Sequence, residues 1–183
     1  FRDELSPSEK AEFINGEVVV HSPATVKHNL ARKRLVKLLD THVTLHRLGM
    51  VLDEKTLIGL TRNDYEPDVN FFGPDKASRL TLDQVVLPAP DFIVEVLSTS
   101  TERNDRGVKF RDYAAHGVQE YWLVDQVLDV IEQYENVEGQ FQLLLKLNTG
   151  VISSRVVRGF QFPIAAVFDD DENLAALRQI LSA

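Results

Sequence analysis

The chain has 183 residues, of which 44% are hydrophobic and 26% charged, and it carries a formal net charge of −8 and no cysteine. That length and hydrophobic content predict one domain, residues 1–183, with a core of its own, and the missing cysteines exclude disulfides, thiolate nucleophiles and cysteine-bound zinc. No apolar run reaches the roughly 18 residues that cross a bilayer and no leader pattern is present, so we expect a cytoplasmic protein with no membrane partner.

The first predicted elements are a hairpin and a long helix. Residues 12–20 read as a strand with a turn at Asn15-Gly16, a dipeptide typical of hairpins. A helix of about residues 24–48 follows, with Gly49 as its expected C-terminal cap residue. This helix carries six basic residues and one acid, so its formal charge is +5 while the rest of the chain sums to −13. Its basic face is either a phosphate-binding surface or an ordinary solvated one.

The middle and the end of the chain alternate between strands and helices. Three short strands are predicted at residues 50–52, 56–60 and 68–72, before a loop over residues 73–90. Residues 91–97 (DFIVEVL) are apolar except at two acids, which is typical of a central strand covered on both faces. A helix at 101–116 ends at Gly117. An antiparallel meander and a last helix are then predicted at residues 120–124, 127–134, 140–147 and 151–157, and at 172–181. This order predicts an α/β (α+β) fold with helices on a mixed sheet.

Three acidic residues on predicted strands suggest a metal site. Glu95 lies inside IVEVL, where a carboxylate is costly to bury unless a cation meets it. Asp68 and Asp91 each follow a proline at the head of an apolar run, and Asp91 shares one strand face with Glu95. Without cysteine, converging carboxylates favour Mg²⁺ or Mn²⁺. The structural alternatives are an ion pair or an exposed strand end for Glu95, and turn chemistry for the two aspartates.

Two further side chains have a structural and a functional interpretation. Lys109, on the helix after the Glu95 strand, is either a solvated lysine or an ammonium that reaches back to Glu95 and orients a water molecule. His28 lies on the apolar arc of the basic helix, where a histidine is more often a core residue than a ligand. The chain has no glycine-rich nucleotide loop, no HExxH and no GxSxG, which disfavours nucleotide cofactors, zinc proteolysis and serine hydrolysis.

A family resemblance rests on five segments in a fixed order: FINGEVVVHSP (13–23), EPDVNFF (66–72), PDFIVEVLSTST (90–101), DRGVKFRDYAAHGVQEYWLVD (105–125) and GFQFPIAAVF (159–168). With them the chain resembles a prokaryotic family of mostly uncharacterised proteins regarded as restriction endonucleases, within the PD-(D/E)XK nuclease superfamily. The resemblance implies a restriction endonuclease-like fold, a mixed central β-sheet flanked by helices. It also implies that Asp68 and Glu95 are the two acids of the superfamily motif.

The motif lysine normally lies two residues after the second acid, where this chain has Leu97. The resemblance therefore places that lysine at Lys109, on the next helix. Glu17 and His28 match positions that the family tends to keep, so they are second-line catalytic candidates.

The implied activity is metal-dependent hydrolysis of phosphodiester bonds in nucleic acid, with DNA as the expected substrate. Asp68 and Glu95, with the backbone carbonyl of Val96, would hold one Mg²⁺ or Mn²⁺, and Lys109 would position the attacking water. Related nucleases are often two-fold dimers, so a homodimer is expected by analogy. Two alternatives stay open: an inactive nuclease fold that binds nucleic acid or a protein partner, which Leu97 and the acidic net charge favour, and a metal-dependent hydrolase with another substrate.

Overall fold

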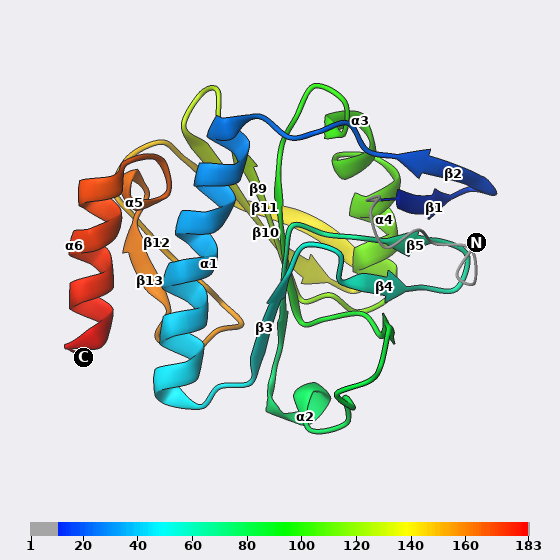
Figure 1. Ribbon diagram of the computed structural model, residues 1–183, viewed down its shortest axis with the longest axis horizontal. Helices are drawn as coiled ribbons and strands as arrows, with labels where there is room; N and C mark the ends of the chain where they lie inside the picture. Colours follow the sequence, from blue (N-terminus) through cyan, green and yellow to red (C-terminus); the bar gives the residue numbers. More distant parts are fainter. Residues whose placement is uncertain (1–10, 183) are drawn as a thin grey trace.

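The computed structural model describes residues 11–182, which fold around a six-stranded mixed sheet in the order β11-β10-β9-β8-β6-β3 (Figure 1). Its strands are, in chain order, β3 (Met50–Asp53), β6 (Val69–Phe72), β8 (Phe92–Val96), β9 (Glu120–Asp125), β10 (Val130–Val137) and β11 (Gln140–Leu147). The β8–β9 pair is parallel and the other neighbours are antiparallel. The predicted mixed sheet is confirmed, and the strand that carries Glu95 is central in it.

A second sheet, in the order β2-β1-β5-β4-β7, lies beside the central one. Its strands are β1 (Ala11–Ile14), β2 (Glu17–Val20), β4 (Leu57–Gly59), β5 (Asp64–Tyr65) and β7 (Val86–Leu87). The β1–β2 hairpin turns at Asn15-Gly16 as predicted, with positive φ at both residues. The short strands β5 and β7 were not predicted, because two residues carry no readable alternation.

The predicted four-stranded meander is wrong in its last member. Strands β9, β10 and β11 follow one another as antiparallel neighbours, but β12 (Val151–Ser153) pairs with β13 (Gln161–Pro163) in a separate two-stranded sheet. Since Ile152 and Phe162 are both buried, this small sheet closes one side of the core instead of extending the meander.

The long basic helix forms as α1 (Val26–His46). Thr25 caps its start, because the Thr25 hydroxyl accepts a hydrogen bond from the backbone N–H of His28 at 3.2 Å. The predicted Gly49 cap is wrong: Arg47 takes the left-handed cap conformation with φ 55°. A glycine is nevertheless required at position 49, since a Cβ there would lie 2.1 Å from the carbonyl oxygen of Phe72.

The helix predicted over residues 101–116 is divided in two. The segments are α3 (Glu102–Asp105) and α4 (Val108–Ala115), and the break falls at Gly107. The chain folds so tightly there that a Cβ on Gly107 would lie 2.5 Å from the carbonyl oxygen of Arg103. The remaining helices are α2 (Pro74–Ala77), α5 (Ala165–Phe168) and α6 (Asp170–Leu181).

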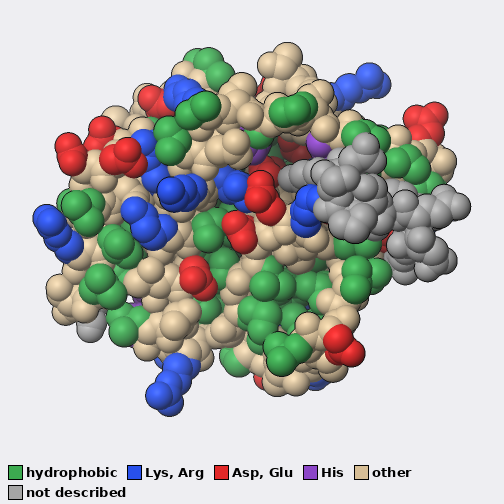
Figure 2. Space-filling model, in the orientation of Figure 1, with side chains coloured by type: hydrophobic (Ala, Val, Ile, Leu, Met, Phe, Trp, Pro, Cys, Tyr) green, Lys and Arg blue, Asp and Glu red, His purple; other side chains and the backbone are tan. Residues whose placement is uncertain are grey.

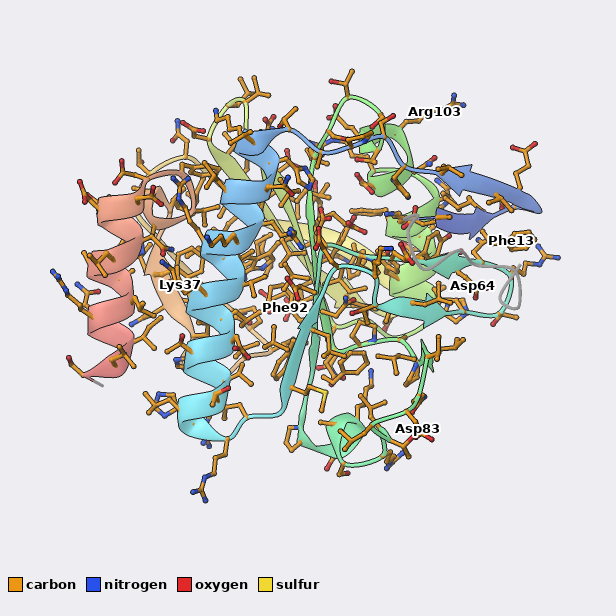
Figure 3. The ribbon with its side chains drawn as sticks, in the orientation of Figure 1. Phe13, Lys37, Asp64, Asp83, Phe92 and Arg103 are labelled. Atoms are coloured by element: carbon orange, nitrogen blue, oxygen red, sulfur yellow. The ribbon has the colours of Figure 1, made fainter. Side chains whose placement is uncertain are left out.

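The central sheet separates two apolar cores. Phe92, Val94 and Val96 of β8 face α1, α5 and α6, whereas Ile93 and Leu97 face α4 and the second sheet. Figure 1 shows α1 and α6 on one side of the strands and α4 with β1, β2, β4 and β5 on the other. Phe92, labelled in Figure 3, lies in the layer between α1 and the strands. No helix within residues 11–182 is long and apolar enough to cross a membrane.

Candidate active site

A cavity of about 230 Å³ opens at the carboxyl end of β8. Its walls come from the start of α1, the loop after β8 and the side chains of Asp68, Glu95 and Lys109. Figure 2 shows a hollow in the upper part of the visible face where histidine and acidic side chains gather. The sequence thus brings together three of its predicted site residues from three separate segments.

Asp68 and Glu95 hold each other in place. The Glu95 carboxylate accepts a hydrogen bond from the backbone N–H of Asp68 at 3.2 Å, and Asp68 Oδ2 accepts one from the backbone N–H of Val96 at 2.8 Å. Both carboxylates are buried. Because β6 and β8 are antiparallel neighbours with Val69 opposite Val94, the residue that precedes β6 meets the end of β8.

Lys109 reaches the same point from α4. Its Nζ donates to Glu95 Oε1 at 3.0 Å, and its side chain is only 2% exposed. Leu97, at the usual lysine position, instead packs into the core beneath α4. The helix therefore supplies the ammonium that the strand lacks, and the alternative of a solvated lysine is excluded by its burial.

Two acids that were not predicted complete the arrangement, which we call the carboxylate–lysine cluster: Glu12, Asp68, Glu95, Asp105 and Lys109. Lys109 Nζ lies 2.8 Å from Glu12 Oε1 and 3.1 Å from Asp105 Oδ1. The signal for Asp105 is its spacing four residues before Lys109 within the helix predicted over residues 101–116. Glu12 shares a strand face with the apolar Ile14, which is the same kind of signal that identified Glu95.

Burial and mutual repulsion set the charge of the cluster. Burial raises the pKa of Glu95 to about 8, and Asp105, Asp68 and Glu12 add to this effect although Lys109 opposes it. Burial likewise raises the pKa of Asp105. Glu12 is also buried, but the nearby Lys109 and His21 outweigh that burial and lower its pKa. Three carboxylates, those of Glu12, Glu95 and Asp105, thus share the ammonium of Lys109, and protonation of Glu95 is favoured relative to a free glutamate.

A Tyr113 hydroxyl also orients Glu95, because it donates to Oε1 at 3.1 Å from the next turn of α4. His28 lies at the cavity wall, where its Nε2 is 3.5 Å from Asp68 Oδ2 and the side chain is buried. The structure thus places His28 beside the predicted acids, in contact with one of them.

The structure does not bring Glu17 or Asp91 to the cluster. Glu17 is exposed at the start of β2. Asp91 lies on the same strand face as Glu95, as expected, but four residues along a strand correspond to about 13 Å. Asp91 is bound instead by Lys76, whose Nζ lies 2.9 Å from Oδ1. A single metal ion cannot bridge that separation.

The donor set of the cluster fits a hard divalent cation. Carboxylate oxygens are the ligands that Mg²⁺ and Mn²⁺ prefer, and the excess negative charge around one ammonium would be offset by a cation. Within residues 11–182, no three His, Asp or Glu side chains converge as a complete ligand set. Asp68 and Glu95 would therefore need water, a backbone carbonyl or phosphate oxygens beside them, and Mg²⁺ commonly keeps several waters.

Two proteins of a cyanobacterium are similar to this chain over most of its length. The chain is 31% identical over 146 residues to the uncharacterised protein sll1609 of Synechocystis sp., covering 79% of this chain and 82% of that protein. It is 33% identical over 140 residues to the uncharacterised protein slr1290 of the same organism, covering 74% and 72%.

The fold is shared with a solved structure described as a putative nuclease from Anabaena variabilis. The two superpose with a TM-score of 0.74 at 17% sequence identity, over 91% of this chain and 90% of the other. The family model named Uma2 and described as a putative restriction endonuclease matches residues 2–165. The chain belongs to the Uma2 family, as the resemblance in its sequence predicts.

Proposed function

We propose that this protein is a divalent-metal-dependent nuclease that hydrolyses phosphodiester bonds of DNA. The observation that carries the proposal is the convergence of Asp68, Glu95 and Lys109 at one cavity, with Lys109 Nζ 3.0 Å from Glu95 Oε1. Such a reaction needs two acids and an amine. Here one acid directly precedes a strand, the other lies on the central strand, and the amine comes from a helix. Membership of a family described as restriction endonucleases supports the same reaction class.

Each side chain has a distinct role in this proposal. A bound Mg²⁺ or Mn²⁺ would supply Lewis acidity and a more acidic water. Asp68 and Glu95 would hold it, and the backbone N–H of Val96 keeps Asp68 oriented. Lys109 would orient the attacking water and offset negative charge on the phosphate. Glu12 and Asp105 hold the ammonium of Lys109 between them and so position it.

The basic helix α1 is the proposed contact for the DNA backbone. Lys27, Arg32 and Arg34 are bound to acidic partners. Lys33 and Lys37 are exposed and form no ion pair with the part of the chain that the structure describes. Basic side chains gather over α1 in Figure 2, and Lys37, labelled in Figure 3, points outward from it. These two lysines are the cations on α1 that remain available for phosphate.

Nicking of a supercoiled plasmid tests the proposal. The wild-type protein should nick DNA with Mg²⁺ or Mn²⁺ and stop when EDTA is added, whereas Glu95→Gln and Lys109→Met should lose at least about 100-fold in rate. Asp83→Asn is the matched control, since it also neutralises a carboxylate but at an exposed loop position. Nicking that persists in both cluster variants would overturn the site assignment.

The inactive-fold alternative is favoured by one observation, the lack of a complete three-ligand set among the described residues. Calorimetric titration with Mn²⁺ distinguishes the nuclease from the inactive fold. A working site binds Mn²⁺ at micromolar to millimolar concentration, and the Asp68→Asn variant should not bind it. An inactive fold shows no saturable heat of binding. The homodimer expected by analogy stays a prediction, which sedimentation of the purified protein would test.

A further inference from the structure

A second and larger cavity, of about 720 Å³, lies at the opposite end of the central sheet. We call it the basic pocket and define it by the charged or titratable side chains that line it: His46, Arg47, Asp75, Lys76, Arg79, Asp91 and Arg158. The end of α1 and the helix α2 flank it, and Figure 1 shows both at the bottom of the molecule, while the start of α1 is at the top. The positions of His28 and His46 on α1 are separated by about 27 Å of helix, so the two cavities are distinct.

Asp91, one of the two acids that line this pocket, is already bound by neighbouring groups. Asp91 accepts hydrogen bonds from the backbone N–H of Gly73 at 2.7 Å and from Gln119 at 3.2 Å, and it pairs with Lys76 at 2.9 Å. The Lys76 ammonium also donates to two backbone carbonyls, at 2.8 and 3.1 Å. Asp91 and Lys76 therefore neutralise each other and build the wall, which leaves ligand contacts to other residues.

Three guanidinium groups at the rim have no such partner. Arg47, Arg79 and Arg158 are exposed and form no ion pair with any residue in 11–182. Arg47 is not consumed in closing α1 either, because backbone N–H groups of Arg47 and Leu48 bind the last carbonyls of the helix. Asp75 is the other acid in the lining, so the rim carries an excess of positive charge in a chain whose net charge is −8.

We propose that the basic pocket binds a phosphate group. Guanidinium groups recognise phosphate through paired, charge-assisted hydrogen bonds. Three of them around a concavity, with the local carboxylate neutralised, form a site for a multiply charged anion. The phosphate could belong to a nucleic-acid backbone or to a free phosphoanion, since both offer the same oxygens. This site is separate from the carboxylate–lysine cluster and does not require that the cluster be catalytic.

Binding of phosphate compounds in the presence of EDTA tests the proposal, because EDTA removes divalent metal and so prevents metal-mediated contacts at the carboxylate–lysine cluster. Calorimetry with inorganic pyrophosphate and fluorescence anisotropy with a labelled DNA duplex would be run on the full chain. The test variant is the triple change Arg47→Ala, Arg79→Ala and Arg158→Ala. The matched control removes three exposed arginines elsewhere: Arg62→Ala, Arg111→Ala and Arg178→Ala. The single variant Arg79→Ala should give an intermediate loss if the triple variant folds poorly.

The proposal expects pyrophosphate affinity to fall at least about tenfold in the triple variant and to stay within about twofold in the control. If the affinity for the DNA duplex falls as well, with a shallower salt dependence, the phosphate that the pocket binds belongs to nucleic acid. If only the affinity for pyrophosphate falls, the ligand is a free phosphoanion. Equal losses in both triple variants, or no binding of pyrophosphate to the wild type, would overturn it. Plasmid nicking is scored separately, so loss of nuclease activity alone leaves this result unchanged.

Discussion

Replacing Lys109 with methionine removes the one ammonium shared by Glu12, Glu95 and Asp105, at 2.8, 3.0 and 3.1 Å respectively. Methionine keeps much of the side-chain volume, so the change tests charge more than packing. Removing one partner of a buried ion pair costs about 3–5 kcal/mol, because the other charge is left uncompensated. We therefore expect Lys109→Met to lower the free energy of unfolding by this amount at pH 9 in the presence of EDTA.

The pH dependence distinguishes this cause from a packing defect. Carboxylates without their cation can take up protons as the pH falls, so the destabilisation by Lys109→Met should shrink between pH 9 and pH 6. Urea unfolding at both pH values measures it. The control is Lys146→Met, since Lys146 pairs with Glu132 at 2.9 Å but its side chain is 56% exposed, and its loss should cost below about 1 kcal/mol. A cost for Lys109→Met below about 1 kcal/mol at pH 9, or one independent of pH, would refute the reasoning.

Three other substitutions carry defined expectations. The pKa of Glu95 is raised from 4.5 to about 8, so between these pH values the folded protein holds a proton that the unfolded chain releases. The free energy of unfolding of the wild type therefore falls as the pH rises from 4.5 to about 8. In urea titrations with EDTA, Glu95→Gln should flatten that fall. Tyr113→Phe removes one donor to Glu95 and should cost about 1 kcal/mol in thermal unfolding, with a smaller loss of nicking than Lys109→Met. Glu120→Gln should cost about 1.5–3 kcal/mol by the same assay, since the Glu120 carboxylate accepts from five donors, including Ser154, and nicking per folded molecule should be unchanged.

The central part of the site was predictable because charge inside an apolar strand is rare. Glu95 was identified in this way, and the apolar run around it correctly predicted a central strand. Lys109 could not be derived from spacing, since its approach depends on the break at Gly107 and on how α4 packs over β8. The sequence left Lys109 open between a solvated lysine and one that reaches Glu95, and the family resemblance favoured the second.

The missed and misplaced residues have physical reasons. Glu12 lies in a short hairpin strand that reads as a surface feature, so its burial depends on contacts with Lys109 and with the backbone of Glu66, far along the chain. Asp91 was placed on the correct strand face, but alternation gives the face and not the position along the strand. β12 was assigned to the meander because local alternation cannot select its partner, and it pairs with β13 instead.

The most direct test of the central claim is the structure of the protein crystallised with Mn²⁺ and measured at the manganese absorption edge. The account predicts one anomalous peak in the cavity, within about 2.3 Å of carboxylate oxygens of both Asp68 and Glu95, with the other ligands supplied by water or backbone. Lys109 should remain beside that peak without binding it. A fully occupied crystal with no peak at these two carboxylates, or with manganese bound only elsewhere, would contradict the account.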